Sequence, residues 1–156
     1  MTIQHAAPAD ADLVLKLLAY NNWASRKQSP PPKESFEPSS LLEQELRSST
    51  SQALIYYVPA GPAGAVQFTE KKDHIEFYKL SVVIEYRGHK IEQELIGYLE
   101  GMAKEKGNNY ICCRVQSDEC MNHLDYEALN YQRNRHYYFK NSGDGPVDIY
   151  YMYKEL

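Results

Sequence analysis

The stretch Arg87-Gly88-His89-Lys90 joins a run of apolar and β-branched residues to a helical pattern. A turn that leads directly into a helix presents free backbone N–H groups, and the helix dipole adds partial positive charge to them. Such a turn can bind a phosphate group. Glycine favours this binding, because side chains obstruct the close approach of backbone N–H groups to phosphate oxygens. Residues 87–92 are therefore a candidate anion-binding turn.

Two residues of this turn stand where a small residue would suit a phosphate best. Lys90 restricts the backbone, but its side chain adds a cation that could itself contact phosphate. Glu92 adds a carboxylate to the first turn of the helix, where phosphate would bind. A like-charge contact at 4 Å costs about 1 kcal/mol in a water-like dielectric and several times more when partly buried. The sequence thus leaves open whether the turn binds phosphate weakly or not at all.

The thiols offer a second kind of chemistry. Cys112 and Cys113 are adjacent in a predicted strand, so their thiols point to opposite faces. Cys120 and His123 have no recognised zinc-binding spacing, and we expect no metal site. An odd number of cysteines without a framework of spacings predicts reduced thiols, and hence a cytoplasmic protein.

Composition limits the classes of protein to which the chain can belong. Its 156 residues, of which 43% are hydrophobic and 24% charged, predict one globular domain spanning residues 1–156. The net charge of −4 argues against nucleic-acid binding, because phosphate neutralisation needs clustered Lys and Arg. No apolar run approaches the ~18 residues of a membrane helix. The N-terminal stretch also lacks the basic region of a signal peptide.

Hydrophobic periodicity and turn residues place these groups on a series of strands and helices. The helix that follows the turn ends before Gly107, and Gly97 and Gly101 on one of its faces predict close packing there. A later helix is expected to begin at Asp118 and to share one face among Met121, Leu124, Ala128 and Tyr131. The predicted strands are Thr2–His5, Ala53–Val58, Gly64–Thr69, His74–Ile84, Tyr110–Val115, His136–Lys140 and Val147–Tyr153.

The order of these elements resembles the GCN5-related N-acetyltransferase (GNAT) superfamily over nearly the whole chain. The best local match is LSVVIEYRGHKIEQELIGYLEGMAKEKG, followed by the strand YICCRV. Members have the turn pattern Arg/Gln-x-x-Gly-x-Gly/Ala, which Lys90 and Glu92 break. The resemblance implies an α/β fold, with helices on both faces of a mixed sheet of about seven strands. It also implies that residues 80–84 splay from the strand at 110–115.

Acetyl-CoA is the cofactor that the resemblance implies, as a co-substrate that enters the splayed strands. Its pantetheine arm would pair with the strand backbone, and its pyrophosphate would lie on the turn and the helix N-terminus. The implied cofactor-binding residues are Leu80, Ser81, Val82, Arg87, Gly88, His89, Lys90, Ile91 and Glu92.

Amine acetylation also needs an acid and a base. The segment ALNYQRNRHYYF resembles the family's Tyr-x-x-x-Gly-Phe region, which makes Tyr131 the candidate general acid; the alternative is that Tyr131 only packs. Glu76 shares a strand face with His74 and is the candidate base, directly or through water. For both of these residues, an exposed polar strand face is the simpler explanation.

Three functions are compatible with these features. One is an acyl-CoA-dependent N-acyltransferase that acts on an unidentified amine, a small molecule or a peptide, in a ternary complex. Another is a non-catalytic binding or regulatory module of the same fold, in which Lys90 and Glu92 have closed the CoA site. The third is a structural homodimer joined through the last strands. No nucleic-acid or membrane partner is expected.

Overall fold

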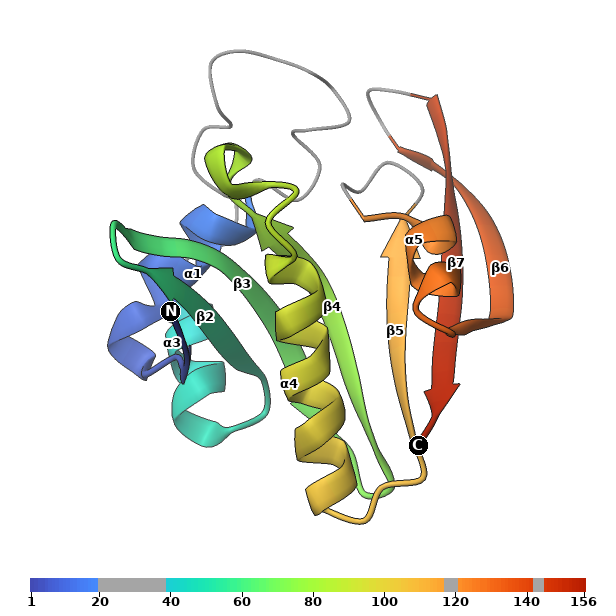
Figure 1. The fold of residues 1–156 in the computed structure, drawn as a ribbon, viewed down its shortest axis with the longest axis horizontal. Helices are drawn as coiled ribbons and strands as arrows, with labels where there is room; N and C mark the ends of the chain where they lie inside the picture. The colour runs from blue at the N-terminus through green and yellow to red at the C-terminus, as the bar shows by residue number, and fades with distance from the viewer. Residues whose placement is uncertain (20–38, 117–120, 142–144) are drawn as a thin grey trace.

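The computed structural model describes residues 1–19, 39–116, 121–141 and 145–156. Seven strands form one mixed sheet, as the sequence predicts, and their order in the sheet is β1-β2-β3-β4-β5-β7-β6 (Figure 1). Every neighbouring pair is antiparallel except β4 and β5, which are parallel. The strands are β1 (Thr2–His5), β2 (Gln52–Val58), β3 (Gly61–Glu70), β4 (His74–Val82), β5 (Tyr110–Gln116), β6 (Gln132–Asn141) and β7 (Gly145–Glu155).

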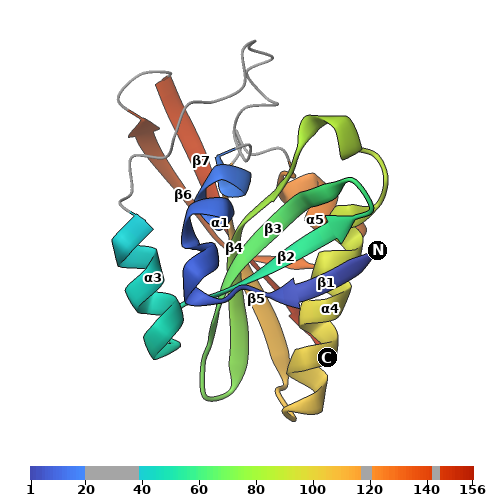
Figure 2. The same cartoon turned by 90° about the vertical axis from the view of Figure 1, so that its left-hand side faces the viewer.

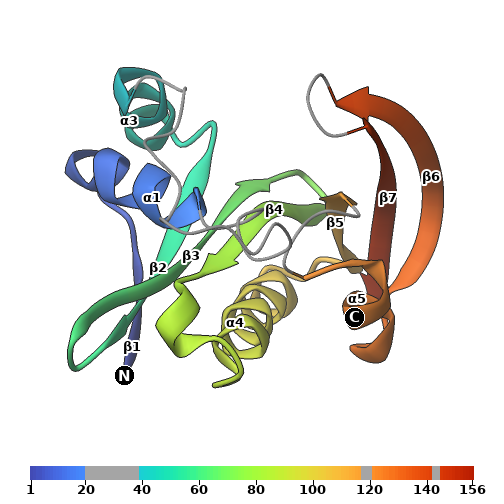
Figure 3. The same ribbon diagram turned by 90° about the horizontal axis from the view of Figure 1, so that it is seen from above.

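Helices cover both faces of this sheet (Figure 3). The face covered by α1 and α3 is called the α1 side, and the face covered by α4 and α5 the α4 side. Figure 2 shows α1 and α3 side by side on their face. Among the described residues, no helix combines the length and apolarity needed to cross a membrane. The helices are α1 (Ala11–Leu18), α3 (Ser39–Ser48), α4 (Ile91–Glu105) and α5 (His123–Ala128), with short 3₁₀ turns η1 (Pro8–Asp10) and η2 (Ile84–Tyr86).

The larger apolar cluster lies between the sheet and α4. It buries alternate residues of β4, including Ile75 and Phe77, against Leu95 and Leu99 of α4. All four side chains are fully buried. The alternation of β4 therefore leaves His74 and Glu76 on the α1 side, in agreement with the predicted shared face.

Strands β4 and β5 pair over only part of their length. Their register runs from His74 opposite Tyr110 to Phe77 opposite Cys113 and stops there. β4 continues to Val82 while still paired with β3, and β5 continues to Gln116 while paired with β7. The two strands thus part beyond Phe77, as the predicted splay requires (Figure 1).

A β-bulge begins directly after the last shared pair. The register with β3 shifts between Tyr78, which lies opposite Gln67, and Ser81, which lies opposite Ala65. Lys79 within this step has φ +57°. A bulge bends its strand and increases the local twist. It therefore gives a physical reason for β4 to follow β3 away from β5.

The turn from β4 to α4 contains two residues in the left-handed region. Gly88 has φ +83°, and Lys90, which precedes the first helical residue, has φ +64° and ψ +18°. This conformation costs a residue with a Cβ roughly 1–2 kcal/mol, whereas glycine adopts it freely. The backbone at Lys90 therefore has the shape that favours glycine at this position of the family pattern.

Both helices on the α4 side end at a left-handed residue. Gly107, with φ +76°, follows α4 as predicted. Asn130, with φ +72°, ends α5 earlier than predicted, and the Tyr131 N–H donates to the Tyr126 carbonyl at 3.0 Å. This bond belongs to a Schellman motif, which ends the helix. Tyr131 therefore lies beyond α5, and its ring packs on that of Tyr126.

Three predictions of local structure are wrong. Leu124 does not lie on a buried face of α5, because 60% of its surface is exposed. Gly97 and Gly101 do not mark close packing of α4 on the sheet, because a Cβ at either position would meet no atom of the described chain within 4 Å; packing on a partner stays a prediction. α5 is capped by Asn122, whose side chain accepts from the Leu124 N–H at 2.9 Å. The predicted start at Asp118 lies outside the described residues.

Truncation of Leu99 should destabilise the protein by about 2–5 kcal/mol, because Leu99→Ala leaves a cavity under α4. The matched control Leu124→Ala, on the exposed surface of α5, should change stability by less than about 0.5 kcal/mol. Urea unfolding followed by circular dichroism measures both values. Equal destabilisation by the two variants would contradict this description of the core.

Candidate active site

The free edge of β4 beyond Phe77 is one side of the candidate site. Leu80, Ser81 and Val82 are 3%, 1% and 1% exposed, so their side chains are withdrawn into the protein. Beyond Phe77, the side of β4 that faces β5 pairs with no described strand. Such an edge offers peptide N–H and C=O groups to an extended ligand. Leu80 and Val82 can therefore contribute mainly through their backbone.

Ser81 adds a polar group that the described structure leaves unsatisfied. Its Oγ atom is buried and has no hydrogen-bond partner among the described residues. A buried hydroxyl without a partner costs free energy, and such groups occur at sites where a ligand or water completes the bonding. Ser81 therefore adds a polar atom without a described partner to the segment of β4 that has the free edge.

Arg87 links the turn to the end of β4 by a hydrogen bond. Its Nε atom donates to the Val82 carbonyl oxygen at 3.0 Å. The guanidinium is thus held beside the last residue of the strand, where the turn begins. In addition, Gly88, His89 and Lys90 are exposed, and Ile91 is buried beneath the start of α4.

The N-terminus of α4 has no side-chain cap. Lys90 occupies the cap position and makes no capping hydrogen bond, so the N–H groups of the first turn keep their donor capacity. Glu92 is half-buried in that first turn. Glu94 accepts a hydrogen bond from the Tyr56 hydroxyl of β2, which raises the pKa of Tyr56. The first turn of α4 therefore combines free N–H donors and Lys90 with two carboxylates, Glu92 and Glu94, whose charges oppose an anion.

Tyr131 lies on the α4 side, at the level where β4 and β5 part. Its ring contacts that of Phe77 edge-on, with ring centroids 6.2 Å apart. The side chain is only 2% exposed, and its hydroxyl donates to Glu100 Oε2 at 3.5 Å. Burial and the Glu100 carboxylate both raise the pKa of Tyr131. The residue is thus protonated at neutral pH and packed among aromatic rings, one of which, Phe77, belongs to the last residue pair that β4 and β5 share.

Glu76 lies on the opposite face of the same region. It is half-buried on the α1 side of β4 and pairs in register with Cys112 of β5. Burial is the largest cause that raises the pKa of the Cys112 thiol to about 12, and the Glu76 charge adds to it. His74 lies next to both side chains on this face. The structure therefore brings the candidate base beside His74, as the shared strand face predicts, and beside Cys112, which the sequence gave no reason to join to it.

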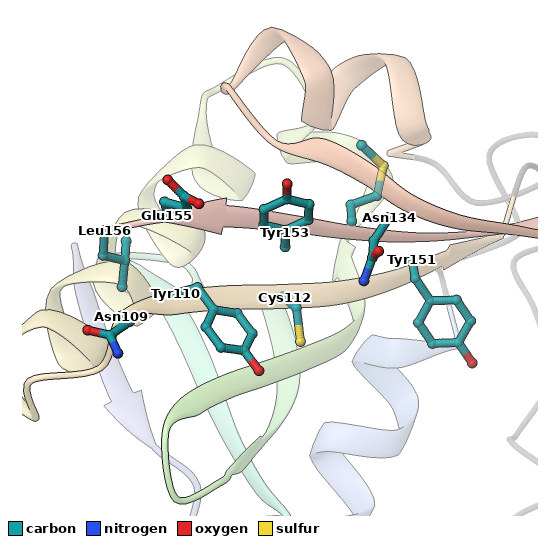
Figure 4. Close-up of a pocket in the computed structure, with 9 residues that line it drawn as sticks. Asn109, Tyr110, Cys112, Asn134, Tyr151, Tyr153, Glu155 and Leu156 are labelled. Carbon is teal, nitrogen blue, oxygen red and sulfur yellow. The ribbon is translucent and has the colours of Figure 1, made fainter.

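A cavity of about 610 Å³ opens on the α1 side of β5 and β7 (Figure 4). Antiparallel pairing sets Cys112 opposite Tyr153 and Tyr110 opposite Glu155, which brings their side chains onto one face. The sequence analysis did not group these residues, and only alternation along both strands could have done so. The cavity is lined by Asn109, Tyr110, Cys112, Asn134, Tyr151, Met152, Tyr153, Glu155 and Leu156.

No protein-family model matches the sequence, and no curated protein matches it. Among solved structures, the chain is similar to a ribosomal-protein-alanine N-acetyltransferase from Brucella melitensis, with a TM-score of 0.72, 18% identity and 100% of each chain covered. An acetyltransferase of the GNAT family from Streptococcus pneumoniae matches with a TM-score of 0.72 and 18% identity over 99% of each chain.

A putative acetyltransferase from Salmonella typhimurium, solved with its cofactor acetyl-CoA, matches with a TM-score of 0.73 and 14% identity. That match covers 100% of this chain and 94% of the other. At these identities the likeness is one of fold, and it agrees with the splayed strands and with the turn that leads into α4. The chain therefore has the fold of the GCN5-related N-acetyltransferase superfamily.

Proposed function

We propose that the protein is an N-acyltransferase that transfers an acetyl group from acetyl-CoA to an amine within a ternary complex. The observation that carries this proposal is the parting of β4 and β5 beside the uncapped N-terminus of α4. An extended carrier with an anionic end needs both features at once. The free edge of β4 can bind the extended part of the carrier, and the turn at the N-terminus of α4 can bind its anionic end.

Several residues at the place where β4 and β5 part fit acetyl-CoA. The free edge of β4 between Leu80 and Val82 would bind the pantetheine amides, because it has no described strand partner; at its end, Arg87 Nε already donates to the Val82 carbonyl oxygen. The turn from Arg87 to Glu92 would hold the pyrophosphate, through Gly88, the free N–H groups of α4 and the Lys90 side chain. The similar protein from Salmonella typhimurium, which was solved with acetyl-CoA, supports this assignment.

Acid and base would act from opposite faces of the sheet. Glu76 on the α1 side would accept the proton of the attacking amine, directly or through water. Tyr131 on the α4 side would give its proton to the departing CoA thiolate, and its raised pKa keeps that proton in place at neutral pH. The thioester carbonyl would lie between them, just beyond Phe77 and Cys113, where the two strands part.

The amine would approach from the α1 side, through the cavity over β5 and β7. Three tyrosines line this cavity, together with the Glu155 carboxylate and the Asn109 and Asn134 amides. Aromatic faces and a carboxylate attract cations, and most amines are protonated at neutral pH. The cavity therefore suits a cationic amine that loses a proton before it attacks.

A non-catalytic module is the second candidate function. The observation that favours it is Glu92, whose carboxylate lies in the first turn of α4, where it would repel pyrophosphate. Lys90 is a weaker argument, because its backbone already has the left-handed shape that glycine would supply. The two candidates therefore differ in whether CoA binds at all.

Titration calorimetry with acetyl-CoA should give a Kd below about 100 μM, which corresponds to about −5.5 kcal/mol. S-acetylpantetheine, which lacks the pyrophosphate, should bind at least 10-fold more weakly if the turn holds that group. If millimolar acetyl-CoA gave neither a heat of binding nor a thermal shift, the transferase proposal would be wrong. The non-catalytic binding module would then be the remaining candidate function.

Removal of the opposing charge at the turn should strengthen CoA binding. Glu92→Gln keeps the size of the side chain and should lower the Kd by about 2- to 5-fold, as loss of 0.5–1 kcal/mol of repulsion predicts. The double variant Lys90→Gly with Glu92→Gln should keep this gain in CoA affinity if Lys90 contributes only backbone strain. A weaker affinity in the double variant would show that Lys90 itself contacts phosphate. Glu105→Gln, at the other end of α4, is the charge-matched control.

Loss of either proton-transfer group should lower kcat/KM by about 10²- to 10⁴-fold. The assay follows release of free CoA thiol with a diamine, an aminoglycoside or an alanine-terminated peptide as acceptor. Tyr131→Phe is compared with Tyr126→Phe, a buried tyrosine in the same ring cluster, and Glu76→Gln with Glu105→Gln. Equal losses from Tyr131→Phe and Tyr126→Phe would assign Tyr131 to packing alone.

A further inference from the structure

Three side chains with metal-ligating atoms meet on the α1 side, where β4 and β5 still pair. His74 and Glu76 come from β4 and Cys112 from β5, and one ligand atom of each lies within 4.8 Å of the others. Ligand atoms around a tetrahedral zinc ion lie about 3.3–3.8 Å apart, given bonds of 2.0–2.3 Å. Small side-chain rotations would therefore bring the three atoms to bonding distance.

The parallel register creates this group. Glu76 lies opposite Cys112, and His74 lies two residues earlier on the same face of β4. Two alternate residues of one strand and one residue of its neighbour thus form a triangle on a rigid part of the sheet. The sequence separates Cys112 from the other two by the whole of α4, so no short motif reveals them.

His74 is already oriented by its neighbours. Its Nδ1 atom lies 2.8 Å from Asp73 Oδ1, and its ring stacks on that of Tyr110 with centroids 4.6 Å apart and an interplanar angle of 13°. A carboxylate on one imidazole nitrogen is the arrangement that fixes histidine ligands in metal sites. Because Asp73 engages Nδ1, the nitrogen left for a metal is Nε2.

The surroundings suit an ion with an open coordination position. All three side chains are half-buried, so they are partly shielded from water yet accessible to an ion. Cys112 also lines the 610 Å³ cavity, in which a water molecule or a small ligand could complete the coordination (Figure 4). Three protein ligands and one open position is the pattern of a reactive or exchangeable zinc site rather than a closed structural one.

We propose that His74, Glu76 and Cys112 bind one borderline-soft divalent ion, of which Zn²⁺ is the best fit. Thiolate and imidazole ligands select Zn²⁺ or Co²⁺ over Mg²⁺ and Ca²⁺, which need several oxygen ligands. On binding, the S–H bond of Cys112 breaks, its proton passes to solvent, and a sulfur–metal bond replaces it. Glu76 cannot ligate a metal and act as a base together, so the loaded protein would lack the proposed base. The metal proposal itself does not rest on the proposed function.

Titration of the reduced full-length protein with Co²⁺, followed by Zn²⁺ competition, tests the site. We expect one ion per chain and a thiolate-to-cobalt charge-transfer band that Zn²⁺ abolishes and excess Mg²⁺ does not. Cys112→Ser should remove the band, and His74→Gln and Glu76→Gln should each weaken binding at least 10-fold. Thermal unfolding of every variant without metal establishes that it is folded.

The other two thiols of the chain provide matched controls. Cys113→Ala, whose thiol points to the other face of the same strand, and Cys120→Ser should retain both the band and the affinity. Persistence of the band in Cys112→Ser, or its loss in Cys120→Ser, would overturn the assignment. Unchanged Zn²⁺ affinity in both His74→Gln and Glu76→Gln would do the same, because Cys112 would then bind metal without them.

Discussion

The short pairing between β4 and β5 is the constraint on which the candidate site depends. The two strands share four residue pairs, and each then stays with its antiparallel neighbour, β3 or β7. The bulge at Lys79 bends β4 away at the point where the shared register stops. If the pairing continued to Val82, no free strand edge would face β5 beside the turn. The turn into α4 would then have no free strand edge leading to it.

The parting leaves polar backbone without a strand partner, which a folded protein accepts only where solvent or a ligand satisfies it. α4 compensates in part, because its apolar face covers β4 and keeps Phe77 and Leu99 fully buried. The same helix directs its uncapped N-terminus toward the turn. A single element thus stabilises the opened sheet and supplies its candidate anion-binding groups.

The paired part of the two strands has a different role. There β4 and β5 pair residue by residue, and this pairing holds the side chains of His74, Glu76 and Cys112 together on the α1 side of the sheet. Tyr131 lies on the other face, against Phe77. The candidate acid, the candidate base and the proposed metal ligands therefore lie close to the last residue pairs that β4 and β5 share.

The sequence by itself determined the order of the elements, the seven strands, the stop at Gly107 and the two faces of β4. These follow from local periodicity and from residues such as glycine, whose backbone preferences act within a few positions. It could not show that Asn130 would end α5 and leave Tyr131 outside it, or that Gly97 and Gly101 would face solvent. Only the tertiary structure decided the left-handed shape at Lys90, the bulge at Lys79 and the meeting of Glu76 with Cys112. These depend on register between strands far apart in the chain, and register arises from the packing of the whole sheet rather than from any local pattern.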